Sequence, residues 1–370
     1  MVGARLMWIA AACTAACGRI GFDPLADAGA PTVFAYMVDQ DTNDSATSIY
    51  IFSLDLATGA IAETAQFDLG AVPWFVVANP RATALYATSR SGSISTLSID
   101  PATGALTRVA SIPAGSWPFM LTFAAGGAIA YAADYSGFGT TTGGAVRGYA
   151  VQPDDSLVEI AGSPWPNGGD DTDWVVVDPS DRWLYALDDG SEKLWGYAVG
   201  DDGSLTAQPT NAWATGDSGP HAAVIAADGV RGYIAPDLAG GIPAFTIEPP
   251  TGKLATAPGS PFGSSANTSE VAAFDASGLL HVANDGNSTH SVFAIDAATG
   301  ALTHVPGSPL SFTESVWWVA PAPLGDTYVT LWQPSSIAQV HATAAGCTIV
   351  AKYPLPAALH APQLAFARVR

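Results

Sequence analysis

The sequence predicts an all-β fold, a ring of seven four-stranded β-sheets that is called a seven-bladed β-propeller. The prediction rests on the composition, on a recurring turn and on the spacing of short apolar runs. Gly and Pro occupy 65 of the 370 positions, and the acidic residues divide into 27 Asp and 6 Glu, with only 3 Lys. Asp and Gly favour turns, whereas Glu and Lys favour exposed helix faces. The composition therefore argues against a helical protein.

A turn with the pattern Asp-x-x-Thr-Gly, or a variant of it, recurs along the chain. It occurs at Asp55–Gly59, Asp100–Gly104, Gln152–Ser156, Asp201–Ser204, Glu248–Gly252, Asp296–Gly300 and, more loosely, Ala342–Gly346. Successive turns lie roughly 45 to 50 residues apart, which is the spacing of propeller blades. Seven turns therefore predict seven blades.

Short β-branched or aromatic runs give each unit its strands. The clearest innermost runs are Val76–Ala78, Val175–Val177 and Ala272–Phe274, and the second runs are Ala84–Thr88, Trp183–Leu187 and Leu280–Ala283. The third runs, which lead into the turns, include Ser48–Leu54 and His290–Ile295. A fourth run follows each turn, and no amphipathic helix of useful length interrupts the series. An array of β-sandwiches is the alternative, but the regular repeat favours the propeller.

The end of the chain is expected to close the ring. Leu364–Arg368 aligns with the innermost strand of a blade, so it should complete the blade that begins near Val33. We therefore expect one propeller domain over residues 33–370. Residues 18–32 are rich in Gly, Ala, Asp and Pro, a composition typical of a flexible tether.

Residues 1–17 have the features of a targeting segment. Arg5 precedes an apolar stretch, Leu6 to Ala16, which is too short to span a bilayer. The small residues before Cys17 resemble the lipidation site of bacterial lipoproteins. Cys13, after three Ala, is a weaker second candidate, and an ordinary cleaved signal peptide is the simpler alternative. Lipidation of Cys17 would place the protein in the cell envelope, held at the membrane by its lipid alone.

Cysteine and charge content restrict the remaining possibilities. After processing at Cys17, Cys347 would be the one cysteine left, so no intrachain disulfide is expected. The chain has 33 acidic and 13 basic residues, a net charge of −20, which argues against a nucleic-acid partner. A hydrophobic content of 48% excludes a disordered protein. We expect a monomer that uses neither a metal ion nor a cofactor.

Equivalent positions of the innermost strands form a column with an unusual composition. Loops that enter these strands meet at one mouth of the central channel. Aligning the seven units places the following residues in register: Trp74, Phe119, Asp173, His221, Glu270, Trp317 and Pro362. Three neighbouring blades thus supply an acid, a base and a second acid, while the facing blades supply aromatic rings. This combination suits a small neutral ligand, such as a sugar ring or a lactone.

The proposed roles follow from these residue types. Carboxylates gathered at a narrow mouth raise one another's pKa, and a neighbouring imidazole can relay protons, so Glu270, His221 and Asp173 are the candidate catalytic residues. Trp74, Phe119 and Trp317 are the candidate substrate-binding residues. The alternative is that these polar groups only bond loop backbones and water. Asp170 to Asp173 could instead bind calcium, although solvation of a loop is the plainer explanation.

The repeats, taken together, resemble the bacterial lactonase family of seven-bladed propellers, which includes 6-phosphogluconolactonases and carboxymuconate cyclases. The matching segments include Asp100–Thr107, Ala133–Gly139, Gly219–His221 and Ser269–Val271 with His281–Asn284. The resemblance extends over about residues 33–370. It implies lactone hydrolysis, with the family's acidic residue at Glu270 and one of its histidines at His221.

Several departures from the family pattern affect the expected substrate. Gly219–His221 lacks an arginine that the family has, Thr172–Asp173 replaces a Pro-His pair, Asn284–Asp285 replaces Asn-Arg, and Val316–Trp317 replaces Pro-Arg. Without these basic residues, a phosphate would meet a negative mouth. Two functions therefore remain open: a lactonase for a neutral, sugar-type lactone, and a non-catalytic surface propeller that binds a protein or glycan partner.

Overall fold

The computed structural model describes residues 32–40, 46–135, 143–216, 219–237, 240–263, 269–323, 325–332, 334–355, 359 and 362–369. It omits the side chains of residues 210, 211, 269 and 270. The predicted signal peptide, residues 1–17, and all but the last residue of the predicted tether, residues 18–32, lie outside the described residues.

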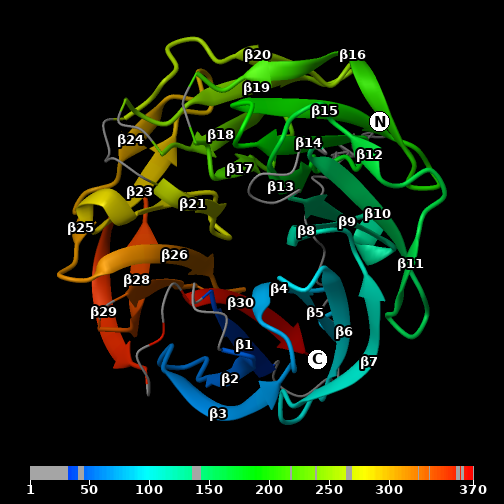
Figure 1. Cartoon of the computed structure of the whole chain (residues 1–370). Coiled ribbons are helices and arrows are strands. Elements are labelled where there is room, and N and C mark those ends of the chain that lie inside the picture. The colour runs from blue at the N-terminus through cyan, green and yellow to red at the C-terminus, as the bar shows by residue number, and fades with distance from the viewer. Residues whose placement is uncertain are drawn as a thin grey trace, which may run out of the picture.

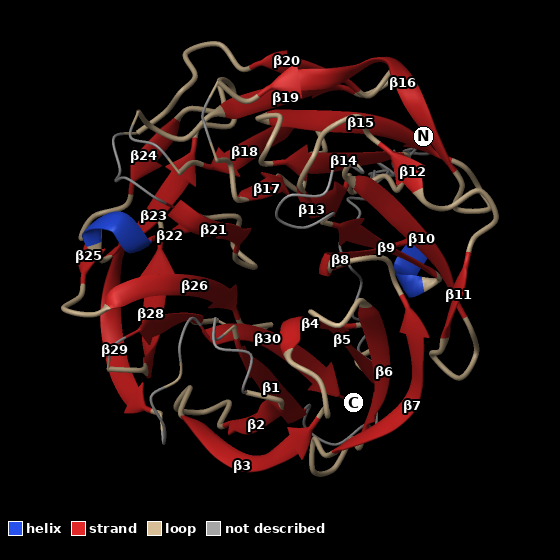
Figure 2. Cartoon of the chain, in the orientation of Figure 1, coloured by secondary structure: helices blue, strands red, loops and turns tan. Residues whose placement is uncertain are grey.

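Seven antiparallel sheets, the blades, stand around one axis (Figure 1). Strands form nearly all of the regular structure (Figure 2). The predicted seven-bladed β-propeller is confirmed.

Each blade extends outward from its innermost strand, in the order given by its hydrogen bonding. Blade I contains β30 (Pro362–Val369), β1 (Thr32–Asp39), β2 (Ser48–Leu54) and β3 (Ile61–Asp68). Blade II contains β4 (Pro73–Ala78), β5 (Ala84–Ser89), β6 (Ser93–Ile99) and β7 (Leu106–Pro113). Blade III contains β8 (Pro118–Ala124), β9 (Ile129–Asp134), β10 (Ala145–Val151) and β11 (Leu157–Glu159), with β12 (Trp165–Pro166) also paired to β10. Blade IV contains β13 (Thr172–Val177), β14 (Trp183–Asp188), β15 (Lys193–Val199) and β16 (Leu205–Ala214).

The remaining three blades follow the same order. Blade V contains β17 (Ala222–Ile225), β18 (Arg231–Ala235), β19 (Ala244–Glu248) and β20 (Lys253–Thr256). Blade VI contains β21 (Ser269–Phe274), β22 (Leu280–Asn284), β23 (Thr289–Ile295) and β24 (Leu302–His304), with β25 (Leu310–Ser311) also paired to β23. Blade VII contains β26 (Ser315–Pro321), β27 (Thr327–Trp332), β28 (Ser336–Thr343) and β29 (Gly346–Pro354). Two 3-10 helices, η1 (Ala125–Gly127) and η2 (Asp285–Asn287), complete the described elements.

The chain closes the ring within blade I, as the sequence predicts. Strand β30 pairs antiparallel with β1, from Thr32 opposite Val369 to Asp39 opposite Pro362. The last strand therefore lies beside the first strands (Figure 1). Gln363 of β30 joins this blade to blade II, because its side-chain amide bonds both the N–H and the C=O of Val76, at 2.9 and 3.1 Å.

The recurring turn owes its shape to its first and last residues. In the turn at Asp100, one carboxylate oxygen accepts the backbone N–H groups of Ala102 and Thr103 and the hydroxyl of Thr103. Gly104 closes the turn with a φ of 71°, and a Cβ there would lie 2.5 Å from the ring of Phe34 in blade I. The turn thus needs Gly both for its backbone conformation and for its close approach to the neighbouring blade.

A buried tyrosine latches most blades to this turn in the next blade. The hydroxyl of a second-strand Tyr donates to a turn carbonyl. The pairs are Tyr36 with Gly104, Tyr86 with Asp155, Tyr131 with Gly203, Tyr185 with Gly252, Tyr233 with Gly300 and Tyr328 with Gly59, at 2.6 to 2.9 Å. Burial raises the pKa of all six tyrosines, so each hydroxyl remains a donor. The repeated turn is therefore a contact between blades as well as a connection within one.

The junction of blades VI and VII uses a different device. His281 stands at the position of the latch tyrosine, pairing with Ala273 of the inner strand as Tyr185 pairs with Val176. It is fully buried and contacts Asp275 at 3.2 Å and His290 at 3.0 Å. The hydroxyl of Thr327 in blade VII lies 3.4 Å from it. One of the seven junctions between neighbouring blades, which we call seams, is thus held by a network of titratable side chains.

Replacing the hydroxyl of one latch tyrosine tests its contribution. We expect Tyr185→Phe to lower the free energy of unfolding by about 1 kcal/mol, because it removes one buried hydrogen bond and leaves the Gly252 carbonyl without it. Urea unfolding followed by tryptophan fluorescence would measure the change. Tyr197→Phe is the matched control, because the Tyr197 hydroxyl is buried without a hydrogen-bond partner among the described residues. A loss at Tyr197 as large as that at Tyr185 would contradict the latch.

Aromatic side chains from three separate blades meet at the centre of the ring. The rings of Phe75 (blade II), Trp174 (blade IV) and Trp318 (blade VII) have centroids 5.7 to 6.3 Å apart. Phe75 and Trp174 are buried, and the Trp174 indole N–H donates to the Ala223 carbonyl at 2.9 Å. These rings close the channel, so the mouth formed by the starts of the inner strands has a floor. No helix among the described residues is long and apolar enough to cross a membrane.

Candidate functional site

The predicted column of residues lies where the inner strands begin, and β-bulges mark it. The pairing of first and second strands skips a residue at this level in five blades. The residues concerned are Trp74, Phe119 with Met120, Asp173, Glu270 and Trp317. His221 directly precedes β17, and Pro362 begins β30. A bulge bends its strand and redirects the extra side chain. The column is therefore set apart from the regular sheet, although the sequence did not predict the bulges.

Hydrogen bonds from the preceding blade fix the backbone of the column. The Gln40 side-chain amide donates to the Trp74 carbonyl at 2.6 Å, and the Thr88 hydroxyl donates to the Phe119 carbonyl at 2.8 Å. The Thr330 hydroxyl does the same for Pro362, at 2.7 Å. All three donors belong to the second strand of a blade or directly follow it. These bonds hold the rim of the mouth in one geometry.

The predicted aromatic residues form a wall. The rings of Trp74 and Phe119 lie 5.3 Å apart, and Trp317 is connected to them because its indole N–H donates to the Gln40 side chain at 3.0 Å. Trp117 and Tyr135 extend the wall, with ring centroids 5.6 Å apart. All five aromatic residues are only partly buried, so they can present apolar surface to a ligand.

A cation outside the predicted column lies on this wall. The guanidinium carbon of Arg90 is 4.0 Å from the ring centroid of Trp74 and 5.6 Å from that of Trp117. These are cation–π distances. The arginines of the family pattern are missing from the column, but Arg90 places one positive charge beside the aromatic wall.

The predicted acid Asp173 and the predicted base His221 come from blades IV and V, and Asp189 interacts electrostatically with both of them. Asp173 is 6% exposed, and one of its carboxyl oxygens is buried with no hydrogen-bond partner among the described residues. Burial raises its pKa well above the usual value, and the charges of Asp189, Asp188 and Asp171 raise it further. A carboxyl in this position retains its proton at higher pH than an ordinary aspartate.

Asp189 follows β14 and is influenced by His221. Burial raises the pKa of Asp189, and Asp237 acts in the same direction, whereas the positive charge of His221 lowers it. Asp173, Asp189 and His221 therefore share one electrostatic environment. The third predicted catalytic residue, Glu270, has its backbone at the bulge of β21, but its side chain lies outside the described part of the structure.

A second set of mouth residues comes from the second strands and is absent from an alignment of the inner strands alone. The residues that directly follow the second strands, or lie one position later, are Gln40, Arg90, Tyr135, Asp189, Asp237 and Asp285. Gln40, Arg90 and Asp189 contact or influence residues of the first column. Aligning the ends of the second strands would have identified this set. Together the two columns divide the mouth into an aromatic side and an acidic side.

Tyr135 joins the two sides. It forms an isolated β-bridge with Asp171, and its ring packs edge-on against Trp117. Burial raises its pKa to about 12, with further contributions from Asp171, Asp189, Asp173 and Asp188. The aromatic wall and the carboxylates are consequently neighbours in one site.

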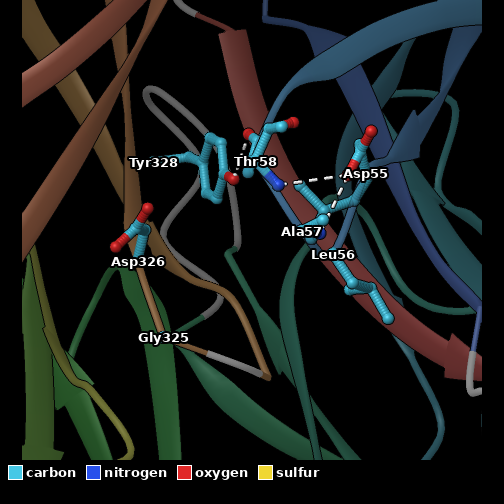
Figure 3. Close-up of a pocket in the computed structure, with 9 residues that line it drawn as sticks. Asp55, Leu56, Ala57, Thr58, Gly325, Asp326 and Tyr328 are labelled. Atoms are coloured by element: carbon cyan, nitrogen blue, oxygen red, sulfur yellow. Dashed lines mark hydrogen bonds between the residues drawn. The ribbon is translucent and has the colours of Figure 1, made fainter.

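A pocket away from the mouth is visible between blades I and VII (Figure 3). It has a volume of about 220 Å³ and is lined by the turn Asp55–Gly59 with Gly325, Asp326 and Tyr328. Asp55 uses its carboxylate to hold the backbone of Ala57 and Thr58, at 2.8 and 3.1 Å. Residues of the column do not line this pocket, which is a gap beside a blade latch. Within the described ranges, no group of three or more His, Cys, Asp or Glu side chains is placed to hold a metal ion.

Comparison with solved structures supports the fold. The structure superimposes on the periplasmic gluconolactonase of Pseudomonas aeruginosa with a TM-score of 0.71 and 20% identity, covering 91% of this chain and all of that one. A provisionally assigned 6-phosphogluconolactonase from Bacteroides uniformis gives a TM-score of 0.72 at 18% identity, over 90% of this chain and 99% of that one. A similar Bacteroides fragilis protein gives 0.71 at 16% identity, over 92% and 98%. At these identities the similarity establishes the fold.

The sequence itself matches a family profile over most of its length. No curated protein gives a significant match. The profile described as "Lactonase, 7-bladed beta-propeller" matches residues 35–311, well over half of the chain. The chain therefore belongs to the lactonase family of seven-bladed β-propellers.

Proposed function

We propose that this protein hydrolyses a sugar-type lactone that carries no phosphate or carboxylate group, at the mouth of the central channel. The observation that carries the proposal is the buried carboxyl of Asp173, which stands at the column bulge of blade IV and whose pKa is raised by burial and by the charge of Asp189. Perturbed titratable groups next to a sugar-stacking surface are typical of a hydrolytic site. The gluconolactonase and 6-phosphogluconolactonase neighbours make lactone opening the natural reaction to test.

In the proposed mechanism, Asp173 is the acid. Because its pKa is raised, it can donate a proton to the ring oxygen as the acyl C–O bond breaks. The oxygen of the attacking water bonds to the carbonyl carbon, and the water gives up a proton. The group that accepts this proton is His221, which interacts with Asp189, or Glu270 of the next blade. The product is an open-chain hydroxy acid. At neutral pH its carboxyl ionises, and the released proton can be measured in solution.

The substrate ring is expected to lie against Trp74, Phe119 and Trp317. The face of an aromatic ring is negative, so it attracts the C–H groups of a sugar ring and disfavours an anion such as phosphate. The carboxylates of Asp171 and Asp189 would repel a phosphate, and Arg90 is already stacked on Trp74. These contacts support a substrate without negative charge. The proposed location is the cell envelope, because residues 1–17 resemble a lipoprotein signal peptide that ends at Cys17.

A panel of lactones, assayed by acid release, tests this function. The protein without residues 1–17 should hydrolyse an uncharged sugar lactone faster than a phosphorylated one, with or without a chelator. His221→Ala or Glu270→Gln should lower kcat by about 100-fold or more, the usual contribution of one acid–base group. Asp201→Asn, which removes an exposed carboxylate in a turn of blade IV, is the control and should leave kcat unchanged.

The same experiment separates catalysis from binding alone. The aromatic wall favours a second candidate function, capture of a glycan or other small ligand without turnover. Ligand binding that is lost in Trp74→Ala and Trp317→Ala, with no acid release from any lactone, would support that function. A hydrolytic rate unchanged by both His221→Ala and Glu270→Gln would exclude the catalytic roles proposed for His221 and Glu270.

A further inference from the structure

The acidic side of the mouth gathers three carboxyl groups whose charges oppose one another, those of Asp171, Asp173 and Asp189. Burial raises the pKa of Asp171, Asp173 and Asp189, and the charge of Asp189 raises the pKa of the other two further. His221 is the positive group that acts on Asp189. A bound cation would relieve this mutual repulsion, whereas a neutral ligand would leave it unchanged and an anion would add to it.

The same carboxylates border aromatic rings. Asp171 is paired through its backbone to Tyr135, and the ring of Tyr135 lies 5.6 Å from that of Trp117 and 6.4 Å from that of Phe119. Carboxylates next to the faces and edges of aromatic rings are the usual surroundings of an organic ammonium group, which both attract. A sugar hydroxyl has no comparable preference for such surroundings.

An unused polar atom also points to a ligand. One carboxyl oxygen of Asp173 is buried without a partner among the described residues, although the residue is only 6% exposed. Buried polar atoms are normally satisfied, so an orphaned oxygen within an acidic cluster is expected to receive a hydrogen bond from a bound group. An ammonium group can supply up to three such donors.

A metal ion does not fit this cluster in the described part of the chain. No three carboxylates or imidazoles there converge on one point. The side chain of Asp188 is committed to the backbone N–H groups of Asp171 and Ser191, at 3.1 and 2.8 Å. The cluster offers separated carboxylates beside a ring, which suits a larger and softer cation than Ca²⁺.

From this juxtaposition we infer that the mouth is specific for a ligand with a protonated amine, held between Asp171 and Tyr135 with Asp173 beside it. The proposed function places a lactone at this mouth. If that function holds, the substrate class is an amino-substituted sugar lactone, so this part of the inference rests on the proposed function. Binding of the amine itself does not depend on turnover.

Calorimetric titration with glucosamine, N-acetylglucosamine and glucose tests the inference, since only glucosamine has an amine that can carry a positive charge. We expect glucosamine to bind about 10-fold more tightly than either of the others, as one partly buried charge contact would give. Raising the salt concentration from about 50 to about 500 mM should lower the affinity for glucosamine and leave the affinity for glucose unchanged. Tetramethylammonium, which cannot donate hydrogen bonds, should compete with glucosamine.

Two variants and a control locate the contact. Asp171→Asn should lower the affinity for glucosamine about 10-fold, and Tyr135→Leu about 3- to 10-fold, in each case by more than it lowers the affinity for glucose. Asp201→Asn removes the same charge at an exposed turn and should change neither ligand. Equal affinities for the three sugars, or a glucosamine affinity unaffected by Asp171→Asn, would overturn the inference.

The outcomes distinguish this inference from the proposed function. Lactone hydrolysis without a preference for the charged amine would overturn the inference and leave the function intact. Tight binding of glucosamine with no hydrolysis of any lactone, including amino-substituted ones, would support the ammonium site and count against hydrolysis. Calcium chloride belongs in the same titration, because tight calcium binding that displaces glucosamine would also overturn an organic-cation site.

Discussion

Asp173→Asn should abolish lactone hydrolysis and at the same time stabilise the fold. The variant removes the proton that is proposed to reach the leaving oxygen, so kcat should fall by about 100- to 10,000-fold. It also removes a buried carboxyl whose charge is unfavourable in the folded state. The free energy of unfolding at pH 7 should therefore rise, by about 1 kcal/mol or more. Acid release and urea unfolding of the same sample would measure both changes.

The pH dependence of that stabilisation has a definite direction. The folded state raises the pKa of Asp173 above its unfolded value of 3.8, so the folded protein holds this proton more tightly than the unfolded chain does. Below about pH 3.8 both states are protonated and the residue costs nothing. Above that pH the loss of folding stability caused by Asp173 grows, until the carboxyl also ionises in the folded state. The advantage of Asp173→Asn should thus grow as the pH rises above about 3.8 and vanish in acid, and Asp201→Asn should show neither effect.

Asp275→Asn should cause the largest loss of stability among single side-chain changes at the blade seams. Asp275 contacts the fully buried His281, and it also accepts the hydroxyl and N–H of Ser277 and the N–H of Leu279. Leaving a buried polar group without its partner typically costs about 1 to 3 kcal/mol, and more where a charged group is involved. We expect a loss of that size in urea unfolding at pH 7. The contribution of Asp275, whose pKa the fold lowers, should persist until the pH falls below its usual range.

Asp296→Asn is the matched control for this seam. Asp296 makes the same kind of turn, accepting the N–H groups of Ala298 and Thr299 and the Thr299 hydroxyl, but it is exposed and has no histidine partner among the described residues. A loss at Asp296 equal to that at Asp275 would show that the turn, and not the buried pair, is responsible.

The histidines of this seam also predict acid sensitivity. Burial lowers the pKa of His290 well below 6.5, and the charge of His281 lowers it further, while Asp275 and Thr327 are the other polar groups at the network. The unfolded chain therefore takes up a proton below about pH 6.5 that the folded protein refuses. This contribution to stability is complete above that pH and declines as the pH falls. The six tyrosine latches have no such dependence in this range.

The blade architecture could be predicted because each blade repeats the same local code. Turn residues such as Asp100 and Gly104 determine their own backbone, and β-branched runs mark the strands between turns. Trp74, Asp173 and Trp317 could then be aligned by counting, since each lies the same number of residues before the end of its inner strand segment. The repeated code is why the ring, the inner strands and the closing strand were all confirmed.

The rest of the site depends on contacts that a linear alignment does not contain. The bulges at Trp74 and Asp173 follow from how two strands pair, and the aromatic floor follows from side chains of three distant blades meeting at the axis. Asp189 gains its importance from its proximity to His221, and Tyr135 from its pairing with Asp171. Residue type suggested the chemistry of the mouth, but its division into an acidic and an aromatic side required the packing.

The pairing of β1 with β30 also determines how the molecule is presented to its surroundings. Thr32 lies opposite Val369, whereas the mouth lies at Pro362, seven residues back along the strand and therefore about 23 Å away. Thr32 therefore lies on the face of the ring opposite the mouth, and a laboratory linker attached at Thr32 itself would join the ring on that face. Immobilised in this way, the protein would hold its binding face outward, so small dissolved molecules could reach it from the surrounding medium.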